Sequence, residues 1–249
     1  MAWAGLRFAI TLLTAVPLPG GRAGAPGRRT AAAALYWAPL VGLALGAAAA
    51  GVLVACRVGH TGPLLASILA IAVLAVLTRG LHLDGLADFA DGLGSRQPAE
   101  QALEIMKRSD VGPFGVVTLV LALLIQVAAL ARADQIGRGP LAIVAAAVAA
   151  RLAVLVSCRR GVPAARPGGL GSLVAGSVHP VAAGAVTLAA VGGAIALGWI
   201  YAAALVAGLA ASAVVTALAV RRLGGVTGDV LGAIAEVTAA VCLLVTAFS

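Results

Sequence analysis

Residues 78–94, with the sequence TRGLHLDGLADFADGLG, carry three of the nine acidic residues in this chain of 249. Asp84, Asp88 and Asp91 are spaced i, i+4 and i+7, which on a helix places them at roughly 0°, 40° and −20°, along one narrow stripe. Three like charges on one stripe repel one another, so the stripe is expected where something positive lies against it. Mg²⁺ is the natural candidate, because it binds through a few carboxylates together with substrate phosphates. A solvated polar helix end is the simpler alternative.

The composition around this stretch is that of a membrane protein. Hydrophobic residues make up 62% of the chain and charged residues only 10%, against about 25% charged residues in soluble domains. Several apolar runs reach the ~20 residues that cross a bilayer as a helix, and they lack the period of two typical of a transmembrane barrel. We therefore predict an all-α fold, a polytopic integral membrane helix bundle that forms a single domain over residues 1–249.

About seven transmembrane helices are expected from these runs. They cover residues 31–56, 63–77, 111–131, 140–158, two spans within 181–220, and 229 to the C-terminus, and the second continues into the acidic stretch. Residues 1–16 are short and carry one polar stripe of Arg7, Thr11 and Thr14, which favours an N-terminal interfacial or half-inserted helix. A Gly/Pro/Arg loop is expected at 20–30, and a short amphipathic helix after Pro98.

The distribution of Lys and Arg sets the expected orientation. With the N-terminus inside the cell, thirteen of these residues lie in cytoplasmic segments and three in outside segments, a bias that the positive-inside rule favours. This topology places the acidic stretch and the basic loop at 221–228 on the same, cytoplasmic, side. The net charge of +8 therefore reflects membrane orientation, and it is not by itself a signal for nucleic-acid binding.

A second group of carboxylates occurs in GGVTGDVLGAIAE, residues 224–236. Asp229 and Glu236 are seven residues apart and share one helix face, and Glu236 would lie about 10 Å into the span. A carboxylate at that depth is costly and indicates a functional site. Alternatively, Thr227 caps the helix and Asp229 interacts with its dipole. Arg151, the other charge inside a span, is expected to pair with an acid or with a substrate phosphate.

A third stretch, EIMKRSDVGPFG at residues 104–115, brings cations close to a helix start. Lys107, Arg108 and Ser109 precede a span whose N-terminal amides face the same compartment, which predicts an anion site. A basic anchor at the membrane surface is an equal alternative. In the acidic stretch, Gly85 and Gly92 would allow a phosphate or a neighbouring helix to approach the backbone.

These three motifs, in this order and at these distances, resemble the adenosylcobinamide-GDP ribazoletransferases, also called cobalamin (5′-phosphate) synthases. The openings FAITLLTAVPLP and ALYWAPLVGLALG are also similar to that family, so the resemblance covers nearly the whole chain. It implies a transferase of cobalamin biosynthesis that joins adenosylcobinamide-GDP to α-ribazole, or to α-ribazole 5′-phosphate, and releases GMP. It also implies Mg²⁺ dependence and a place in the bacterial inner membrane, with a cytoplasmic active site.

The resemblance also implies partners and site residues. The partners would be these small-molecule substrates and membrane lipid, not nucleic acid, with a homo-oligomer or association with other cobalamin-pathway enzymes possible. The expected metal ligands are Asp84, Asp88, Asp229 and Glu236. The expected catalytic base for the ribose hydroxyl is Asp91 or Asp88, and the substrate diphosphate would be held by Lys107, Arg108, Ser109, Gly85 and Gly92.

The second motif departs from the family pattern at one position. The family usually has Lys-Asp-Ser, whereas here Arg108 stands in the place of the acid and Asp110 follows two residues later. If the family acid binds metal, Asp110 would have to replace it.

Two other functions are compatible with part of the pattern. The acidic motif is similar in layout to that of CDP-alcohol phosphotransferases, although it lacks that family's full signature. A transporter could use Asp229, Glu236 and Arg151 as an ion path, but the two halves of the chain show no repeat of the kind typical of many transporters.

Overall fold

The computed structural model describes residues 2–16 and 27–248, which form helices and two isolated β-bridges but no strand. The eleven helices in these ranges are α1 (Ala2–Leu13), α2 (Arg28–Val58), α3 (Pro63–Leu77), α4 (Leu81–Gly94), α5 (Ala99–Ile105), α6 (Pro113–Gln135), α7 (Gly139–Ser157), α8 (Gly169–Val174), α9 (Pro180–Leu197), α10 (Trp199–Leu223) and α11 (Gly228–Ala247). The prediction of an all-α bundle is confirmed, and the short helix expected after Pro98 is α5.

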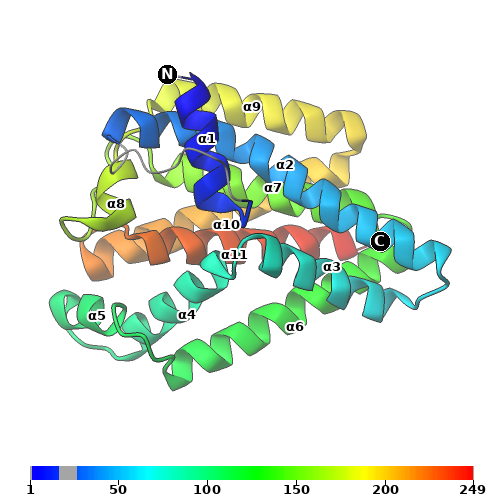
Figure 1. The fold of residues 1–249 in the computed structure, drawn as a ribbon, viewed down its shortest axis with the longest axis horizontal. Coiled ribbons are helices and arrows are strands. Elements are labelled where there is room, and N and C mark those ends of the chain that lie inside the picture. Colours follow the sequence, from blue (N-terminus) through cyan, green and yellow to red (C-terminus); the bar gives the residue numbers. More distant parts are fainter. Residues whose placement is uncertain (1, 17–26, 249) are drawn as a thin grey trace.

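The long helices correspond to the expected membrane spans. Among the described residues, α2, α6, α7, α9, α10 and α11 are each long and apolar enough to cross a bilayer, and α3 with α4 makes a seventh if this bent pair counts as one span. These helices run roughly along the long axis of the molecule (Figure 1). The chain is therefore a multi-pass membrane protein with six or seven spans.

The second span differs from the expectation at the acidic stretch. The chain does not continue straight from α3 into α4 but bends by 89° between them. Arg79 and Gly80 both have positive φ angles, of 56° and 65°, and this left-handed backbone ends α3. The bend turns α4 away from the direction of α3, so the acidic helix packs against α11 and α6.

The first helix is too short to cross a membrane. Its 12 residues span about 18 Å, against a hydrocarbon core of about 30 Å. Gly5, Ala9 and Leu13 are buried, and Figure 1 shows α1 crossing α2 steeply. A Cβ atom at Gly5 would lie 2.7 Å from the Cβ of Ala33. This agrees with a segment that does not span the bilayer, while most of the loop expected at 20–30 lies outside the described residues.

Helices α4 and α11 touch backbone to backbone. A Cβ atom at Gly85 would lie 2.7 Å from the carbonyl oxygen of Asp229 and 2.9 Å from its Cα, and one at Gly232 would lie 3.2 Å from the Cα of Gly85. Small residues at helix interfaces allow this approach in lipid, where apolar side chains gain little by associating. Gly85 therefore serves the neighbouring helix, one of the two alternatives that the sequence left open, and the contact brings the first and third motifs together.

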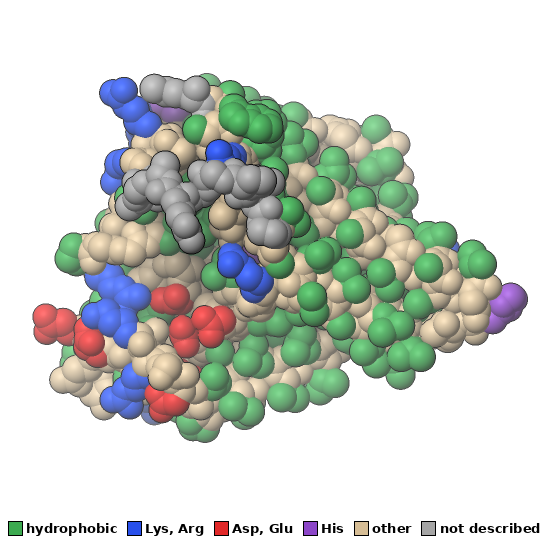
Figure 2. Space-filling model, viewed as in Figure 1, with side chains coloured by type: hydrophobic (Ala, Val, Ile, Leu, Met, Phe, Trp, Pro, Cys, Tyr) green, Lys and Arg blue, Asp and Glu red, His purple; other side chains and the backbone are tan. Residues whose placement is uncertain are grey.

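The charged groups gather at one end of the bundle. Figure 2 shows acidic and basic side chains close together at the end where α4, α5 and α8 lie, while apolar side chains cover most of the remaining face. The expectation that the acidic stretch and the loop at 221–228 share a side is confirmed, since Asp229 contacts Gly85. Near the turn between α6 and α7, Arg57 pairs with Asp134 at 2.5 Å.

The glycine contact predicts a stability difference between two substitutions. Gly85→Ala places a methyl group against backbone atoms that cannot move independently, so we expect a loss of about 1–3 kcal/mol in the free energy of unfolding. Gly192→Ala on α9 is the matched control, because nothing lies within 4 Å of its Cβ position and alanine favours the helix. Thermal unfolding in detergent measures both. A Gly85→Ala protein as stable as the Gly192→Ala protein would contradict the backbone contact.

Candidate active site at the polar end of the bundle

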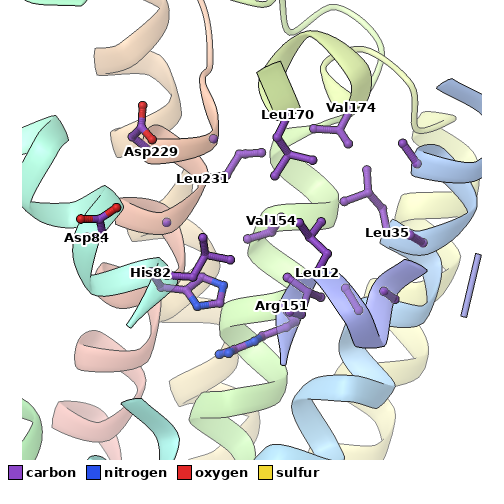
Figure 3. Close-up of a pocket in the computed structure, with 18 of the residues that line it drawn as sticks. Leu12, Leu35, His82, Asp84, Arg151, Val154, Leu170, Val174, Asp229 and Leu231 are labelled. Carbon is purple, nitrogen blue, oxygen red and sulfur yellow. The ribbon is translucent and has the colours of Figure 1, made fainter. Parts of the chain in front are cut away.

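The crossing of α4 and α11 places Asp84 and Asp229 on one cavity of about 290 Å³ (Figure 3). Asp229 lies in the first turn of α11, where a carboxylate interacts favourably with the helix dipole. The hydroxyl of Thr227 accepts a hydrogen bond from the amide of Val230 at 3.2 Å and donates one to Oδ2 of Asp229 at 3.1 Å. Thr227 is therefore the N-cap of α11, and its hydroxyl also restrains the orientation of the Asp229 carboxylate.

Asp88 lies one turn further along α4 and is half-buried. Its carboxylate is within electrostatic reach of the negative charges of Asp84, Asp229 and Asp91, and of the positive charge of Arg166. Asp84 is exposed, and Asp229 is half-buried. Three carboxylates of the two motifs therefore lie close together, with Asp84 and Asp229 on the wall of the cavity and Asp88 beside them.

Arg166 supplies a positive charge beside these carboxylates, and the sequence did not predict it as a site residue. It lies in the loop between α7 and α8, where its Nη2 atom is 3.5 Å from Oδ2 of Asp229 and its Nη1 donates to the carbonyl of Leu103 at 3.1 Å. Arg166 also lines the cavity. A loop residue has no periodicity to predict its direction, so its charge beside a Gly- and Pro-rich segment was the only signal.

Asp91 is engaged at the start of α6. Its carboxylate is buried and accepts hydrogen bonds from the amides of Gly112, at 2.7 Å, and Gly115, at 2.9 Å. A Cβ atom at Gly112 or Gly115 would lie 2.4 Å from a carboxylate oxygen of Asp91, which explains the two glycines of the second motif. Each oxygen of Asp91 is already bonded to the backbone, so this geometry favours a structural anchor and argues against the predicted role as base.

Glu236 is not brought to the acidic mouth of the cavity. Its carboxylate accepts a hydrogen bond from Nε2 of Gln126 on α6 at 2.8 Å, and it lines a second, smaller cavity of about 40 Å³. Arg151 lies between the two cavities and lines both. It lies within electrostatic range of Glu236, but its Nε is buried without a described hydrogen-bond partner, so the predicted pairing with an acid or a phosphate stays a prediction. The geometry separates Glu236 from the other predicted metal ligands.

The cations of the second motif point to solvent. Lys107, Arg108 and Ser109 are exposed, and none of them lines the described cavities. Lys107 pairs with Glu104 at 2.5 Å, and this hydrogen bond lowers the pKa of the Glu104 carboxyl. The structure instead packs Met106 on Gly92, where a Cβ atom would lie 2.7 Å from Cγ of Met106. Gly92 therefore accommodates a side chain, and diphosphate binding by this motif stays a prediction.

The donor atoms at the cavity mouth suit a hard cation. Within the described residues, no three His, Cys, Asp or Glu side chains are already arranged to hold a metal ion. Mg²⁺ in phosphoryl-transfer sites is often bound through one or two carboxylates and completed by waters and substrate phosphates. Asp84 and Asp229 line one cavity, and they offer only oxygen ligands. This set fits Mg²⁺ that arrives with a phosphorylated substrate, but not a closed, four-ligand protein site.

Comparison with known proteins identifies relatives along almost the entire chain. The family model described as cobalamin-5-phosphate synthase matches residues 5–247. A protein of Frankia casuarinae named adenosylcobinamide-GDP ribazoletransferase is 41% identical, with 98% of this chain and 94% of the relative covered. Proteins with the same name from Nocardioides sp. and Bradyrhizobium diazoefficiens are 40% and 39% identical, with 98% of this chain and 96% and 93% of the relatives covered. No solved structure matches the chain.

The anchoring role of Asp91 predicts a stability effect. Replacement by alanine leaves two amides at the start of α6 without their acceptor, so Asp91→Ala should lower the free energy of unfolding by about 1–3 kcal/mol. Asp84→Ala is the matched control, because Asp84 is an exposed acid on the same helix with no described hydrogen bond from its side chain. Chemical or thermal unfolding in detergent compares the two. An Asp91→Ala protein with the same free energy of unfolding as wild type but without activity would contradict the anchoring role and support the predicted role of Asp91 as base.

Proposed function

Since the chain belongs to the cobalamin-5-phosphate synthase family, we propose that it is an adenosylcobinamide-GDP ribazoletransferase. It joins adenosylcobinamide-GDP to α-ribazole, or to α-ribazole 5′-phosphate, and releases GMP. The observation that carries this proposal is the meeting of the first and third motifs at one cavity, which Asp84 and Asp229 both line. Two carboxylates that are 145 positions apart in the chain converge at the mouth of a helix bundle, where a phosphorylated substrate can enter from water.

Asp84 and Asp229 are the residues that would hold Mg²⁺ against the diphosphate of adenosylcobinamide-GDP. When bound, the ion supplies positive charge that stabilises the attacked phosphorus centre and the departing GMP phosphate. Thr227 orients the Asp229 carboxylate through its hydroxyl. The short α4–α11 contact at Gly85 keeps the two carboxylates at a constant separation, so that the substrate meets a preorganised site.

Arg166 would bind a phosphate oxygen of the same substrate. Its guanidinium is at the long end of hydrogen-bond distance from Asp229, 3.5 Å, and a diphosphate would be a stronger partner because guanidinium and phosphate form charge-assisted, often bidentate hydrogen bonds. Its other contact, with the carbonyl of Leu103, holds the loop against α5. Lys107 and Arg108 are exposed in the turn that follows α5. They do not line the cavity, so they would contact only a part of the substrate that extends outside it.

Asp88 is the remaining candidate for the base that takes the proton from the ribose hydroxyl. Asp91 is bonded to the start of α6, whereas the side chain of Asp88 has no described hydrogen bond. Partial burial disfavours the charged form of the Asp88 carboxylate, and the negative charges of Asp84 and Asp229 add to this effect. Proton transfer to Asp88 would accompany attack of the hydroxyl on the diphosphate, and the pair of electrons of the broken P–O bond would leave with GMP.

The orientation of the site follows from the charge distribution. The end of the bundle that carries the acidic mouth also carries most Lys and Arg of the loops, and cytoplasmic loops are enriched in these residues. We therefore propose that the cavity opens to the cytoplasm of a bacterial cell, from its inner membrane. The transporter alternative gains no support from the structure, because Asp229 and Glu236 line separate cavities with Arg151 between them.

The metal role predicts a loss of activity in two variants. Purified protein in detergent should release GMP from adenosylcobinamide-GDP and α-ribazole only when Mg²⁺ is present, and chelation should abolish the release. Asp84→Asn and Asp229→Asn should each lower kcat/KM by about 100-fold or more, since several kcal/mol of charge stabilisation is lost.

Glu100→Gln on α5 is the matched control, because Glu100 is an exposed acid at the same end of the bundle. It should keep wild-type activity. GMP release that persists without Mg²⁺, or near-normal turnover in either aspartate variant, would sink the metal proposal. Absence of GMP release from wild-type protein with both forms of the acceptor would contradict the proposed reaction itself.

A further inference from the structure

The cavity that carries Asp84 and Asp229 extends into an apolar arm. We define this arm by five side chains on the far side of the cavity from the two acids, namely Leu12, Ala34, Leu35, Val154 and Val174. They come from α1, α2, α7 and α8, and Figure 3 shows Leu12, Leu35, Val154 and Val174 across the cavity from Asp84 and Asp229. The whole cavity measures about 290 Å³, just below the range of about 300–1,000 Å³ that is typical of small-ligand pockets.

The arm offers almost no hydrogen bonds to a ligand. The side chains with polar atoms that line the cavity are His82, Asp84, Arg151, Arg166 and Asp229. Asp84, Asp229 and Arg166 belong to the reaction end, while His82 and Arg151 lie together below the arm in Figure 3. A polar group that moves from water into an apolar site without a hydrogen bond loses about 1–3 kcal/mol or more. The arm therefore suits a part of a substrate that is flat or compact and mainly apolar.

The substrates of the proposed function contain one part with these properties. The corrin ring of the cobinamide is much larger than the cavity, and guanine carries several donors and acceptors on its edge that would lose their partners in the arm. The benzimidazole base of ribazole is a flat bicyclic ring with two nitrogens, one of which is bonded to the ribose. With that base in the arm, the ribose would extend toward the wall that carries Asp84 and Asp229, where its hydroxyl is needed.

We propose that the apolar arm binds the aromatic base of the acceptor nucleoside, and that α1 determines which bases fit. This rests on the proposed function and adds the place of one substrate. Helix α1 contributes Leu12 to the wall of the arm, and the buried face of α1, with Gly5 and Ala9, packs it against α2. The N-terminal helix then has a role in specificity that its length and hydrophobicity alone do not predict.

The arm predicts discrimination by size. One methyl group in an apolar pocket changes kcat/KM by about 10–200-fold. Wild-type protein should therefore prefer the riboside of dimethylbenzimidazole over that of unsubstituted benzimidazole by about tenfold or more. Leu12→Phe narrows the arm and should lower this ratio by about tenfold. Leu12→Ala widens it and should allow a riboside whose base has a third fused ring to react at a rate that wild type does not reach.

The experiment measures GMP release by the full chain in detergent, with adenosylcobinamide-GDP and each riboside in turn. Leu43→Phe and Leu43→Ala are the matched controls, because Leu43 lies on α2 with 46% of its surface exposed and does not line the cavity. Their selectivity ratios should equal that of wild type. Because each ratio is taken within one protein preparation, partial loss of folded protein in a variant does not alter it.

Three results would overturn the proposal. The first is a wild-type ratio near one, which would place the base outside a confined apolar site. The second is an equal fall of kcat/KM for all ribosides in both Leu12 variants, which is the effect expected if α1 is only structural or if a lipid chain fills the arm. The third is a change of the ratio in the Leu43 controls. A wild-type protein that releases no GMP with any riboside would instead contradict the proposed function.

Discussion

The direct contact between the backbones of α4 and α11 is the constraint on which the site depends. Gly85 and Gly232 leave no side chain between the two helices. An added methyl group at either position would push the helices apart, and with them Asp84 and Asp229. In a bilayer the association of helices depends on close packing, so two glycines that are far apart in the chain can determine where two carboxylates meet. The two carboxylates repel each other in this arrangement, and a bound cation would relieve that repulsion.

A second link, between Asp91 and the start of α6, holds the acidic helix from its other side. The Asp91 carboxylate accepts hydrogen bonds from two backbone amides at the N-terminus of α6, where the helix dipole also favours a negative charge. The first and second motifs are thus joined by a structural bond, and the first and third motifs by the glycine contact. The three aspartates of the first motif consequently have different roles. Asp84 lines the cavity and Asp88 lies one turn further along α4, whereas Asp91 maintains the geometry of the helix that carries them.

The depth of a residue in the bundle decides its partners as strongly as its helical face does. Asp229 and Glu236 are seven residues apart on α11, yet they line different cavities. At the level of Asp229 the neighbours are α4 and the Arg166 loop, and two turns deeper they are Gln126 and Arg151. Arg151 lies within electrostatic range of Glu236, and it lines both the larger cavity and the smaller one. We consider this cluster a support for the floor of the cavity.

The amino-acid sequence by itself determined the membrane class, the approximate spans, the end of the bundle where charges collect and the motifs that mark the family. These properties depend on composition, on local periodicity and on the spacing of residues within one helix, so they can be predicted without coordinates. Asp84 and Asp229 were predicted in this way, and the structure brings them together. Only the tertiary structure decided the bend between α3 and α4, the partners of Asp91 and Glu236, and the position of Arg166. Each of these depends on contacts between segments that are distant in the chain, or on the backbone angles of a loop, and helical periodicity contains no information on either.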